Sequence, residues 1–412
     1  MSTETYAANI CIYLEMNPDF SRHIAFSDDS FGLLPYQNRM ESKTLKKKKV
    51  AHVCLSKGYG GLEIYSLLIH QMFKAAGYPS THFCLDESGL KKHLEQESLD
   101  FHSFAKAKYF NPSVSLKIRK AVLEENIGSI YVHHLRDLWV VVPAIYGLKD
   151  VKLVGFAQMF LKDVNKKDYL HSLLYGRLRY LISLTDIQKE ALKNCLPIPD
   201  EKYVTIPNSV NMDNYSPEKR DRGLRKSLEV GDNERLIGVV GRLDPLKGQL
   251  ELVEAFSQLS SEFPDIKLLL VGDETPHQPG YKRELESLIS KLNLGNRILL
   301  KGFQSDVNRW MASMDVFVMP SYEETFGIVL IEAMASQVPV VSTRAGGVPE
   351  ILNNGDLGGL AEPKSADSLV MELRKILTHW ERSVETARKA RVVALDRYDL
   401  NNVFKKVESL IQ

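Results

Sequence analysis

The sequence predicts an α/β protein with two domains, each built on a parallel β-sheet that helices cover on both faces. From residue 50 onward, short apolar runs alternate with helix-length amphipathic segments, and the pattern restarts after a polar, turn-rich stretch at residues 211–233. Such alternation is typical of βαβ units, in which a crossover helix joins two parallel strands. The chain has 412 residues, of which 44% are hydrophobic, so it is long enough for two or three buried cores.

The individual elements follow from apolar runs and from helical periodicity. In the first half, we predict a helix at 61–76 and strands at 50–55, 81–85, 129–133, 151–156, 180–184 and 203–206. In the second half, we predict a helix at 281–292 and strands at 236–240, 266–271, 297–300, 316–319 and 338–342. The end of the chain, 365–412, has a helical pattern.

These elements divide the chain into five parts. Residues 1–47 form an N-terminal extension without the α/β rhythm, 48–210 the first domain, 211–233 a linker, and 234–385 the second domain. Residues 386–412 are expected to form a C-terminal helix that packs back on the first domain.

Composition excludes several classes of protein. The 53 basic and 52 acidic residues nearly balance, which argues against nucleic acid as the main partner. Four widely spaced cysteines, without a Cys-x-x-Cys pair, suggest neither a disulfide framework nor a zinc site. No apolar run approaches the roughly 18 residues of a membrane span, and we find no signal peptide. We therefore expect a cytoplasmic protein that meets a membrane only from its surface.

Two basic segments are candidates for such a contact. Lys46–Lys49 could bind an anionic membrane surface, or could be a solvated lead-in to the first strand. Residues 165–179 are predicted as a basic helix with apolar side chains. This helix could touch anionic lipid or a phosphate-bearing glycolipid, or could be an ordinary surface helix.

Three loops at the carboxyl ends of predicted strands are candidate ligand sites, because parallel α/β sheets bind ligands at that edge. The first is Ser56-Lys-Gly-Tyr-Gly-Gly-Leu-Glu63. Its glycines let the backbone approach a ligand, and the helix that follows offers unpaired N–H groups to an anion. A plain tight turn is the alternative, since the spacing is not Gly-x-Gly-x-x-Gly.

The second loop is Gly241-Arg-Leu-Asp-Pro-Leu-Lys-Gly248. Arg242 and Lys247 could together neutralise a diphosphate, which would do the work of a metal ion. The alternative is a pair of solvated surface cations.

The third loop leads into an apolar helix predicted at residues 326–335. Glu324 precedes this helix and Glu332 lies within it, roughly 12 Å further along at 1.5 Å per residue. Carboxylates that far apart cannot share a proton or a metal, but they could accept hydroxyls at two ends of one elongated ligand. Backbone N–H groups around Phe326 and Gly327 would face an anion between them. The alternatives are a helix cap at Glu324 and a structural ion pair at Glu332.

Together these residues resemble the retaining glycosyltransferases of family 4. That family has the GT-B fold, in which two Rossmann-like domains face each other across a cleft. The similar motifs are Glu324-Thr-Phe-Gly with Glu332-Ala-Met-Ala, Gly241-Arg with Lys247-Gly, Gly346-Gly-Val-Pro-Glu350, Gly60-Gly-x-Glu63, and Ile206-Pro-Asn-Ser-Val-Asn211. The resemblance runs from about Lys48 to the C-terminus.

The resemblance implies a role for each matching residue. It implies that Arg242 and Lys247 bind the diphosphate of a nucleotide sugar, with N–H groups of Phe326, Gly327 and Ile328 nearby. Glu324 would hold the sugar hydroxyls and Glu332 the ribose. Gly60 and Gly61 would cover the diphosphate from the first domain, and His134 would lie near the reacting sugar. Without the family, a structural role is the alternative for His134, and His133 should point to the opposite face of its strand.

The resemblance also implies the reaction. A hexose would pass from a UDP-, GDP- or ADP-sugar to a glycan or glycolipid of the cell envelope, such as lipopolysaccharide, with retention and without a metal or other cofactor. The absence of Asp-x-Asp from the chain is in keeping with metal independence. Membrane contact would be peripheral, on the inner face. The alternatives are a synthase of a soluble disaccharide or glucoside and a nonenzymatic nucleotide-sugar-binding protein.

The sequence departs from the family pattern after the strand predicted at 266–271. The family often has Gly-Asp-Gly-Pro there, whereas this chain has Gly272-Asp-Glu-Thr-Pro-His-Gln-Pro-Gly280. This longer loop leaves the identity of the base open.

Overall fold

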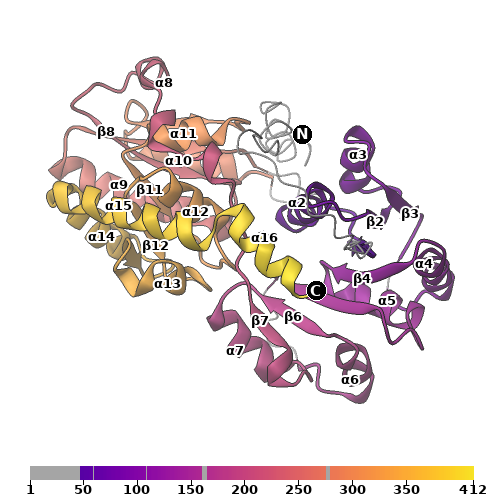
Figure 1. Cartoon of the computed structure of the whole chain (residues 1–412). Helices are drawn as coiled ribbons and strands as arrows, with labels where there is room; N and C mark the ends of the chain where they lie inside the picture. The colour runs from indigo at the N-terminus through magenta and orange to yellow at the C-terminus, as the bar shows by residue number, and fades with distance from the viewer. Residues whose placement is uncertain (1–46, 59, 108, 160–164, 275–278) are drawn as a thin grey trace, which may run out of the picture.

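The computed structural model describes residues 47–412, with gaps at 59, 108, 160–164 and 275–278. Two α/β domains lie side by side, as Figure 1 shows. The predicted two-domain α/β architecture is confirmed. Residues 1–46 of the N-terminal extension, including Lys46, lie outside the described residues.

The first domain contains a seven-stranded parallel sheet in the order β3-β2-β1-β4-β5-β6-β7. Its strands are β1 Lys49–Val53, β2 Ser80–Leu85, β3 Phe101–Phe104, β4 Ile127–Val132, β5 Lys152–Ala157, β6 Tyr180–Ser183 and β7 Tyr203–Thr205. Six of these match predicted strands, and β3 was not predicted. The order places β1 beside β4, so the loops that follow these two strands are neighbours.

The second domain contains a six-stranded parallel sheet in the order β10-β9-β8-β11-β12-β13. Its strands are β8 Arg235–Val240, β9 Ile266–Val271, β10 Ile298–Lys301, β11 Val316–Met319, β12 Val340–Thr343 and β13 Gly359–Ala361. Only β13 was not predicted. Here β8 lies beside β11, which brings the second and third candidate loops together.

Helices cover both faces of the first sheet, because alternate strand residues face opposite layers. Ala51 and Val53 of β1 pack in one cluster with residues of helices α4, α5, α6 and α7. Val50 packs in another cluster with helices α2 and α16. The bounds are α2 Gly61–Ala75, α4 Pro112–Glu124, α5 Leu138–Ala144, α6 Tyr169–Gly176, α7 Asp186–Cys195 and α16 Leu400–Ser409. Helix α3, Gly89–Gln96, packs beside α2.

The second sheet is covered in the same way. Helices α9, α10 and α14 pack on one face, and helices α8, α11, α12, α13 and α15 pack on the other. The bounds are α8 Arg222–Ser227, α9 Gln249–Glu262, α10 Tyr281–Lys291, α11 Val307–Ser313, α12 Ile328–Ala335, α13 Val348–Ile351, α14 Ala366–Thr378 and α15 Trp380–Arg397.

Residues 211–233, predicted as a linker, are instead a packed part of the second domain. Tyr215 and Leu228 are buried in its core cluster. The buried Arg225 donates to Asp315 at 2.8 Å. The prediction was wrong because these few apolar residues are spaced irregularly among polar ones.

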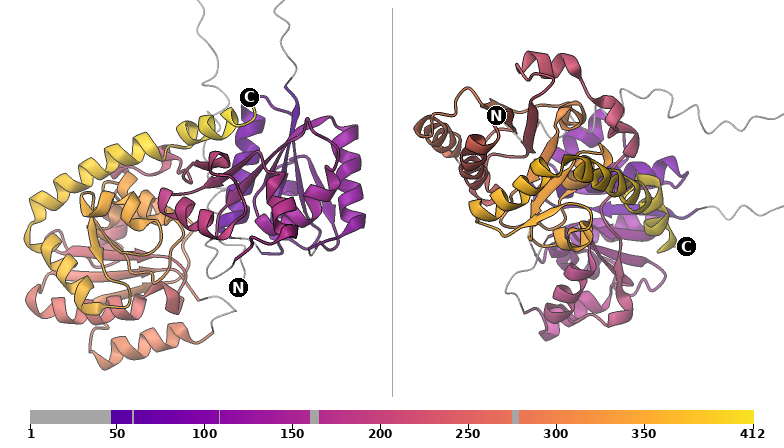
Figure 2. Two further views of the ribbon diagram at one scale, coloured as in Figure 1. Left: turned by 90° about the horizontal axis from the view of Figure 1, so that it is seen from below. Right: turned by 90° about the vertical axis from the view of Figure 1, so that its left-hand side faces the viewer.

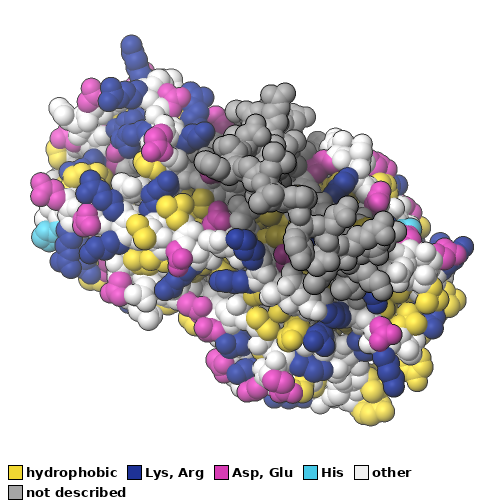
Figure 3. Space-filling model, viewed as in Figure 1, with side chains coloured by type: hydrophobic (Ala, Val, Ile, Leu, Met, Phe, Trp, Pro, Cys, Tyr) yellow, Lys and Arg dark blue, Asp and Glu magenta, His cyan; other side chains and the backbone are white. Residues whose placement is uncertain are grey.

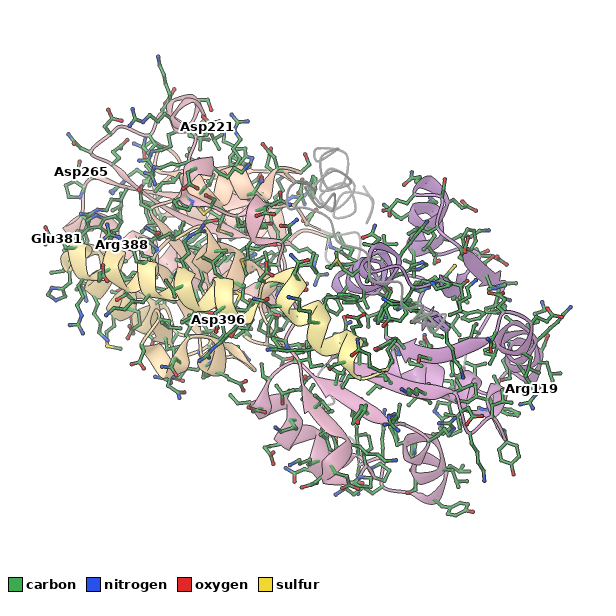
Figure 4. The ribbon with its side chains drawn as sticks, viewed as in Figure 1. Arg119, Asp221, Asp265, Glu381, Arg388 and Asp396 are labelled. Carbon is green, nitrogen blue, oxygen red and sulfur yellow. The ribbon has the colours of Figure 1, made fainter. Side chains whose placement is uncertain are left out.

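The C-terminal segment forms two helices rather than the single helix predicted at 386–412. Helix α15 packs on α12 of the second domain, and the chain then turns at Tyr398 into α16. Phe404 of α16 meets Phe73 of α2 edge to face, with ring centroids 5.0 Å apart. Figure 2 shows α15 and α16 running across both domains, and the labels Glu381, Arg388 and Asp396 follow α15 in Figure 4.

The basic segment 165–179 is helical over a shorter range than predicted. Asp168 caps the N-terminus of α6 by accepting the His171 N–H at 3.1 Å, so the helix begins at Tyr169 and ends at Gly176. None of the helices in the described part of the chain is both long and apolar enough to span a bilayer.

Candidate functional site

The loops after β8 and β11 meet at the carboxyl edge of the second sheet. Lys247 Nζ donates to Glu324 Oε2 at 2.8 Å, and the Tyr322 N–H donates to the Leu246 carbonyl at 2.8 Å. The side chain of Lys247 is 28% exposed and that of Glu324 is 18% exposed. The structure therefore brings together two residues that the sequence placed 77 positions apart.

Gly248 allows this close approach. Its φ is +67°, and a Cβ there would lie 2.1 Å from the carbonyl oxygen of Pro320. Any larger residue would be strained in φ and would push the two loops apart.

Arg242 projects from the same loop and is exposed. In the described part of the chain, its guanidinium has no recorded hydrogen bond or ion pair. Lys247 is neutralised by Glu324, whereas Arg242 is free to bind an anion.

Helix α12 begins beside this cluster. Gly327 is its N-cap, with φ +89°, and Ile328 is its first residue. The first N–H groups of a helix have no acceptor within the helix, so this end attracts an anion. Phe326 is buried against Tyr398, with ring centroids 5.9 Å apart, which fixes where the helix starts.

Glu332 lies on α12, about one turn after its start at Ile328. Burial raises the pKa of the Glu332 carboxyl to about 7, and a hydrogen bond from Tyr215 opposes this shift. Among the described residues we find no ion pair to Glu332. The alternative of a structural ion pair is therefore not supported there.

The first domain supplies His134, at the end of β4. Its Nδ1 accepts the Arg136 N–H at 3.2 Å, and burial, more than the nearby Arg136, lowers the pKa of the imidazole. His134 is therefore neutral near pH 7. His133, as predicted from strand alternation, faces away, and its Nε2 lies 3.2 Å from His52 Nδ1 in the core.

The glycine loop after β1 is held by two residues that the sequence reasoning missed. Asp137 Oδ2 accepts the Leu55 N–H at 2.7 Å, and Arg136 Nη2 donates to the Leu55 carbonyl at 3.0 Å. Asp137 is only 2% exposed, and burial raises its pKa to about 7. No local signal marks Arg136 and Asp137, because the Leu55 peptide groups that they bind lie in a loop about 80 residues earlier in the sequence.

Gly60 and Gly61 open the N-terminus of α2. The Gly60 N–H donates to Glu63 Oε2 at 2.8 Å, and Gly60 is extended rather than left-handed. A Cβ on Gly61 would meet no atom of the described residues within 4 Å. None of the described residues therefore fills the space beside Gly61.

The carboxyl edges of the two sheets meet directly. Gly347, after β12, lies against Thr185, after β6: a Cβ on Gly347 would be 2.7 Å from Thr185 Cγ2. Glu350 Oε2 accepts the Ile187 N–H at the start of α7, at 3.0 Å. The two halves of the candidate site therefore lie on edges that face the same domain boundary.

The site contains no metal cluster in the part of the chain that the structure describes, where no group of three His, Cys, Asp or Glu residues is arranged to hold an ion.

Two family models match the chain. Residues 59–214 match the model described as Glycosyltransferase Family 4, and residues 221–393 match the model described as Glycosyl transferases group 1. Between them they cover both domains, so the chain belongs to the family 4 glycosyltransferases, as the motifs predicted.

Two curated relatives illustrate the similarity. The lipopolysaccharide 1,2-N-acetylglucosaminetransferase of Salmonella typhimurium is 30% identical over 51% of this chain and 56% of its own length. The N-acetylgalactosamine-N,N'-diacetylbacillosaminyl-diphospho-undecaprenol 4-alpha-N-acetylgalactosaminyltransferase of Campylobacter jejuni is 27% identical over 69% of this chain and 77% of its own length. For the first of these, the match spans about half the length of the relative.

Solved structures confirm the GT-B fold. A glycosyltransferase from Rickettsia africae has a TM-score of 0.81 and 23% identity over 89% of this chain and 98% of its own. The HepE protein of Anabaena, in complex with UDP and glucose, has a TM-score of 0.73 and 24% identity over 88% of this chain and 98% of its own.

Proposed function

We propose that this protein transfers a hexose from a nucleotide diphosphate sugar to a glycan or glycolipid acceptor, with retention of configuration, in synthesis of cell-envelope polysaccharide or lipopolysaccharide. The observation that carries the proposal is the cluster of Arg242, Lys247 and Glu324 at the N-terminus of α12. It combines two cations for a diphosphate with a carboxylate for sugar hydroxyls. Relatives named for lipopolysaccharide and for diphospho-undecaprenol acceptors support the acceptor class.

The chemistry follows from this electrostatics. As the bond from the sugar anomeric carbon to the diphosphate oxygen breaks, negative charge grows on the leaving diphosphate. Arg242, Lys247 and the N–H groups at residues 326–328 stabilise that charge without a metal. The acceptor hydroxyl attacks the same face of the sugar and gives its proton to the leaving phosphate. Neutral His134 faces the sugar from the first domain.

A second candidate is a synthase that glycosylates a small soluble acceptor. The N-acetyl-alpha-D-glucosaminyl L-malate synthase of Bacillus anthracis, 29% identical over 52% of this chain, favours it. A nonenzymatic binding protein is less well supported, because Arg242, Lys247, Glu324 and Glu332 are all present.

A thermal-shift panel of UDP-, GDP- and ADP-sugars tests the proposal, because a ligand stabilises the native state in proportion to its occupancy. One nucleotide sugar should raise the unfolding temperature selectively, with or without EDTA. Glu324→Gln should keep the shift caused by the free nucleoside diphosphate and lose most of the turnover. Failure of every nucleotide sugar to stabilise the protein would overturn the proposal.

A further inference from the structure

Exposed apolar side chains are concentrated in one part of the first domain. Ten of the fourteen large hydrophobic side chains that are exposed among the described residues belong to residues 109–187: Tyr109, Phe110, Leu116, Leu123, Tyr146, Met159, Tyr169, Leu170, Leu173 and Ile187. Isolated exposed hydrophobic residues are common on soluble proteins, but a concentration of them on one flank marks an interaction surface.

Half of these ten residues lie on two helices, Leu116 and Leu123 on α4 and Tyr169, Leu170 and Leu173 on α6. Helix α5 contacts both α4 and α6. Arg119 of α4, labelled in Figure 4, donates to the carbonyls of Ala144 and Tyr146 at the end of α5, at 3.0 and 2.8 Å. Trp139 of α5 stands edge to face with His171 of α6, with ring centroids 5.5 Å apart. We call the outer surface of α4, α5 and α6 the docking face.

The stretch of sequence that supplies the docking face is basic. Residues 106–179 contain 13 lysines and arginines against 6 aspartates and glutamates, a net charge of +7, whereas the whole chain has a net charge of +1. Lys117, Lys149, Lys167 and Arg179 are exposed there, and no ion pair to any of the four is recorded in the described part of the chain. Figure 3 shows apolar side chains interspersed with Lys and Arg over the region where Figure 1 places α4 and α6.

We propose that the docking face binds the surface of an anionic phospholipid bilayer. Tyr169, Leu170 and Leu173 would enter the headgroup region, and the lysines would pair with lipid phosphates. Tyrosine, tryptophan and basic side chains are enriched at bilayer interfaces, and each basic residue near an anionic surface adds to the attraction. The inference rests on the proposed function, because a transferase that acts on a lipid-borne acceptor has to dock on the membrane that holds the acceptor.

The mixed chemistry favours a bilayer over a second copy of the chain. Lysine is depleted from the cores of protein–protein interfaces, since a buried ammonium is costly to desolvate. Here exposed lysines alternate with the apolar residues, and two like-charged faces would repel each other. A bilayer accepts both kinds of side chain at once, because lysine stems can extend to the headgroups.

The position of the docking face fits acceptor delivery. Trp139 lies five residues after His134, beyond the carboxyl end of β4. Its ring meets Tyr109, which follows β3, with centroids 6.5 Å apart. One margin of the docking face therefore adjoins the edge of the sheet that carries the first-domain half of the candidate site.

Co-sedimentation with vesicles tests the proposal on the full chain. The wild type should bind vesicles of phosphatidylglycerol and phosphatidylcholine, and not those of phosphatidylcholine alone. The pair Lys117→Glu and Lys167→Glu should weaken binding by at least about tenfold, from the usual contribution of a basic residue near an anionic membrane. Tyr169→Ser with Leu170→Ser should weaken it as well.

Matched controls lie on the second domain. Lys226 and Lys389 are equally exposed, and their reversal to Glu should leave vesicle binding unchanged. If reversal of either pair weakened vesicle binding equally, binding would depend on the net charge of the protein and not on the docking face. That result would overturn the assignment. A wild type that ignores anionic vesicles at low salt would also overturn it, as would a dimer in light scattering that the docking-face variants dissociate.

The thermal shift with a nucleoside diphosphate separates this inference from the proposed function. The docking-face variants should keep that shift while losing vesicle binding. A wild type that binds vesicles but no nucleotide would sink the proposed function and leave the docking face standing. A wild type that binds nucleotide but no vesicle would overturn the docking face and leave the proposed function intact.

Discussion

Lys247 and Glu324 form an ion pair that links the two loops of the proposed nucleotide-sugar site. The pair is only partly exposed, with the two atoms 2.8 Å apart, so each side chain holds the other in place. A diphosphate that takes the Lys247 ammonium would leave the Glu324 carboxylate free to accept sugar hydroxyls. We therefore expect binding of the diphosphate and binding of the sugar to be coupled through this ion pair.

Asp137 should control the order of the glycine loop. Replacing it with alanine removes the acceptor of the Leu55 N–H, and a lost backbone hydrogen bond of about 1 kcal/mol corresponds to roughly fivefold faster opening. Hydrogen–deuterium exchange of the segment 55–61 should rise accordingly, with the interior of α2 unchanged. Asp137→Asn keeps an acceptor oxygen and should restore protection. Identical exchange in the alanine variant and the wild type would contradict the role.

Glu332 should make stability depend on pH in a particular direction. In the folded protein its pKa of about 7 lies above the ordinary value of 4.5. The Glu332 carboxyl therefore favours the folded state fully below pH 4.5, and this contribution to the free energy of unfolding is lost as the pH rises through 7. Glu332→Gln removes the ionisation. Urea unfolding of the two proteins should therefore diverge between pH 5 and 8, with the wild type losing free energy of unfolding relative to the variant. Parallel pH profiles would contradict the prediction.

The candidate residues of the site were predictable from the sequence to different degrees. Arg242, Lys247 and Glu324 stand in loops directly after apolar runs, and that local context points to the edge of a sheet. Arg136 and Asp137 have no such local context, because their role depends on Leu55 peptide groups in the loop after the neighbouring strand β1. The pairing of Lys247 with Glu324 likewise depends on the strand order.

At the scale of elements, four buried histidines lie between the sheet of the first domain and α2. His52 and His82 lie in β1 and β2, His133 directly follows β4, and His70 lies in α2. The rings of His52 and His70 stack with centroids 5.3 Å apart. Burial lowers all four pKa values, to about 3 for His70 and His133, and Lys49 and Lys74 lower that of His70 further.

This histidine cluster should make the first domain sensitive to acid. The four histidines are neutral in the folded protein and protonate near pH 6.5 in the unfolded chain. Their contribution to the free energy of unfolding is therefore present above pH 6.5 and is lost as the pH falls. Each should add about 1.4 kcal/mol per pH unit to the slope of unfolding free energy below about pH 6. In urea unfolding measured across this pH range, His70→Phe should reduce the slope of unfolding free energy against pH by the equivalent of one proton. An unchanged slope in His70→Phe would rule this account out.

The elements that the sequence missed are short or atypical. Strands β3 and β13 have four and three residues, and β3 reads Phe-His-Ser-Phe, without an apolar run. Helix α8 has six residues within a polar stretch. The long amphipathic helices and the fully buried strands have strong periodic patterns in the sequence, and the structure has helices and strands at these places.

At the scale of the whole molecule, the C-terminal segment joins the two domains. Helix α15 packs on the second domain, and α16 packs on the first. The hydroxyl of Tyr131 in β4 donates to the Val407 carbonyl at 2.7 Å, and Val210 pairs with Asp399 in an isolated parallel bridge. A segment remote in sequence thus completes the core of the first domain.

Phe404→Ala should therefore destabilise the first domain, although residue 404 follows the second domain in sequence. The side chain is 5% exposed, and truncating a buried phenylalanine costs about 3–5 kcal/mol. Urea unfolding should show this loss, while Met371→Ala on the surface of α14 should change little. A loss below about 1 kcal/mol would show that α16 contributes little to that core.

The central claim is that the loop carrying Arg242 and Lys247 binds the diphosphate of a nucleotide sugar. Calorimetric titration of UDP, GDP and ADP into the wild type, Lys247→Ala and the surface control Lys226→Ala tests it most directly. For the nucleotide that binds, Lys247→Ala should weaken affinity by roughly 10- to 100-fold, because a hydrogen bond to a charged group contributes about 1.5–3 kcal/mol. The control should match the wild type. Equal affinity in wild type and Lys247→Ala, with both proteins folded, would contradict the account.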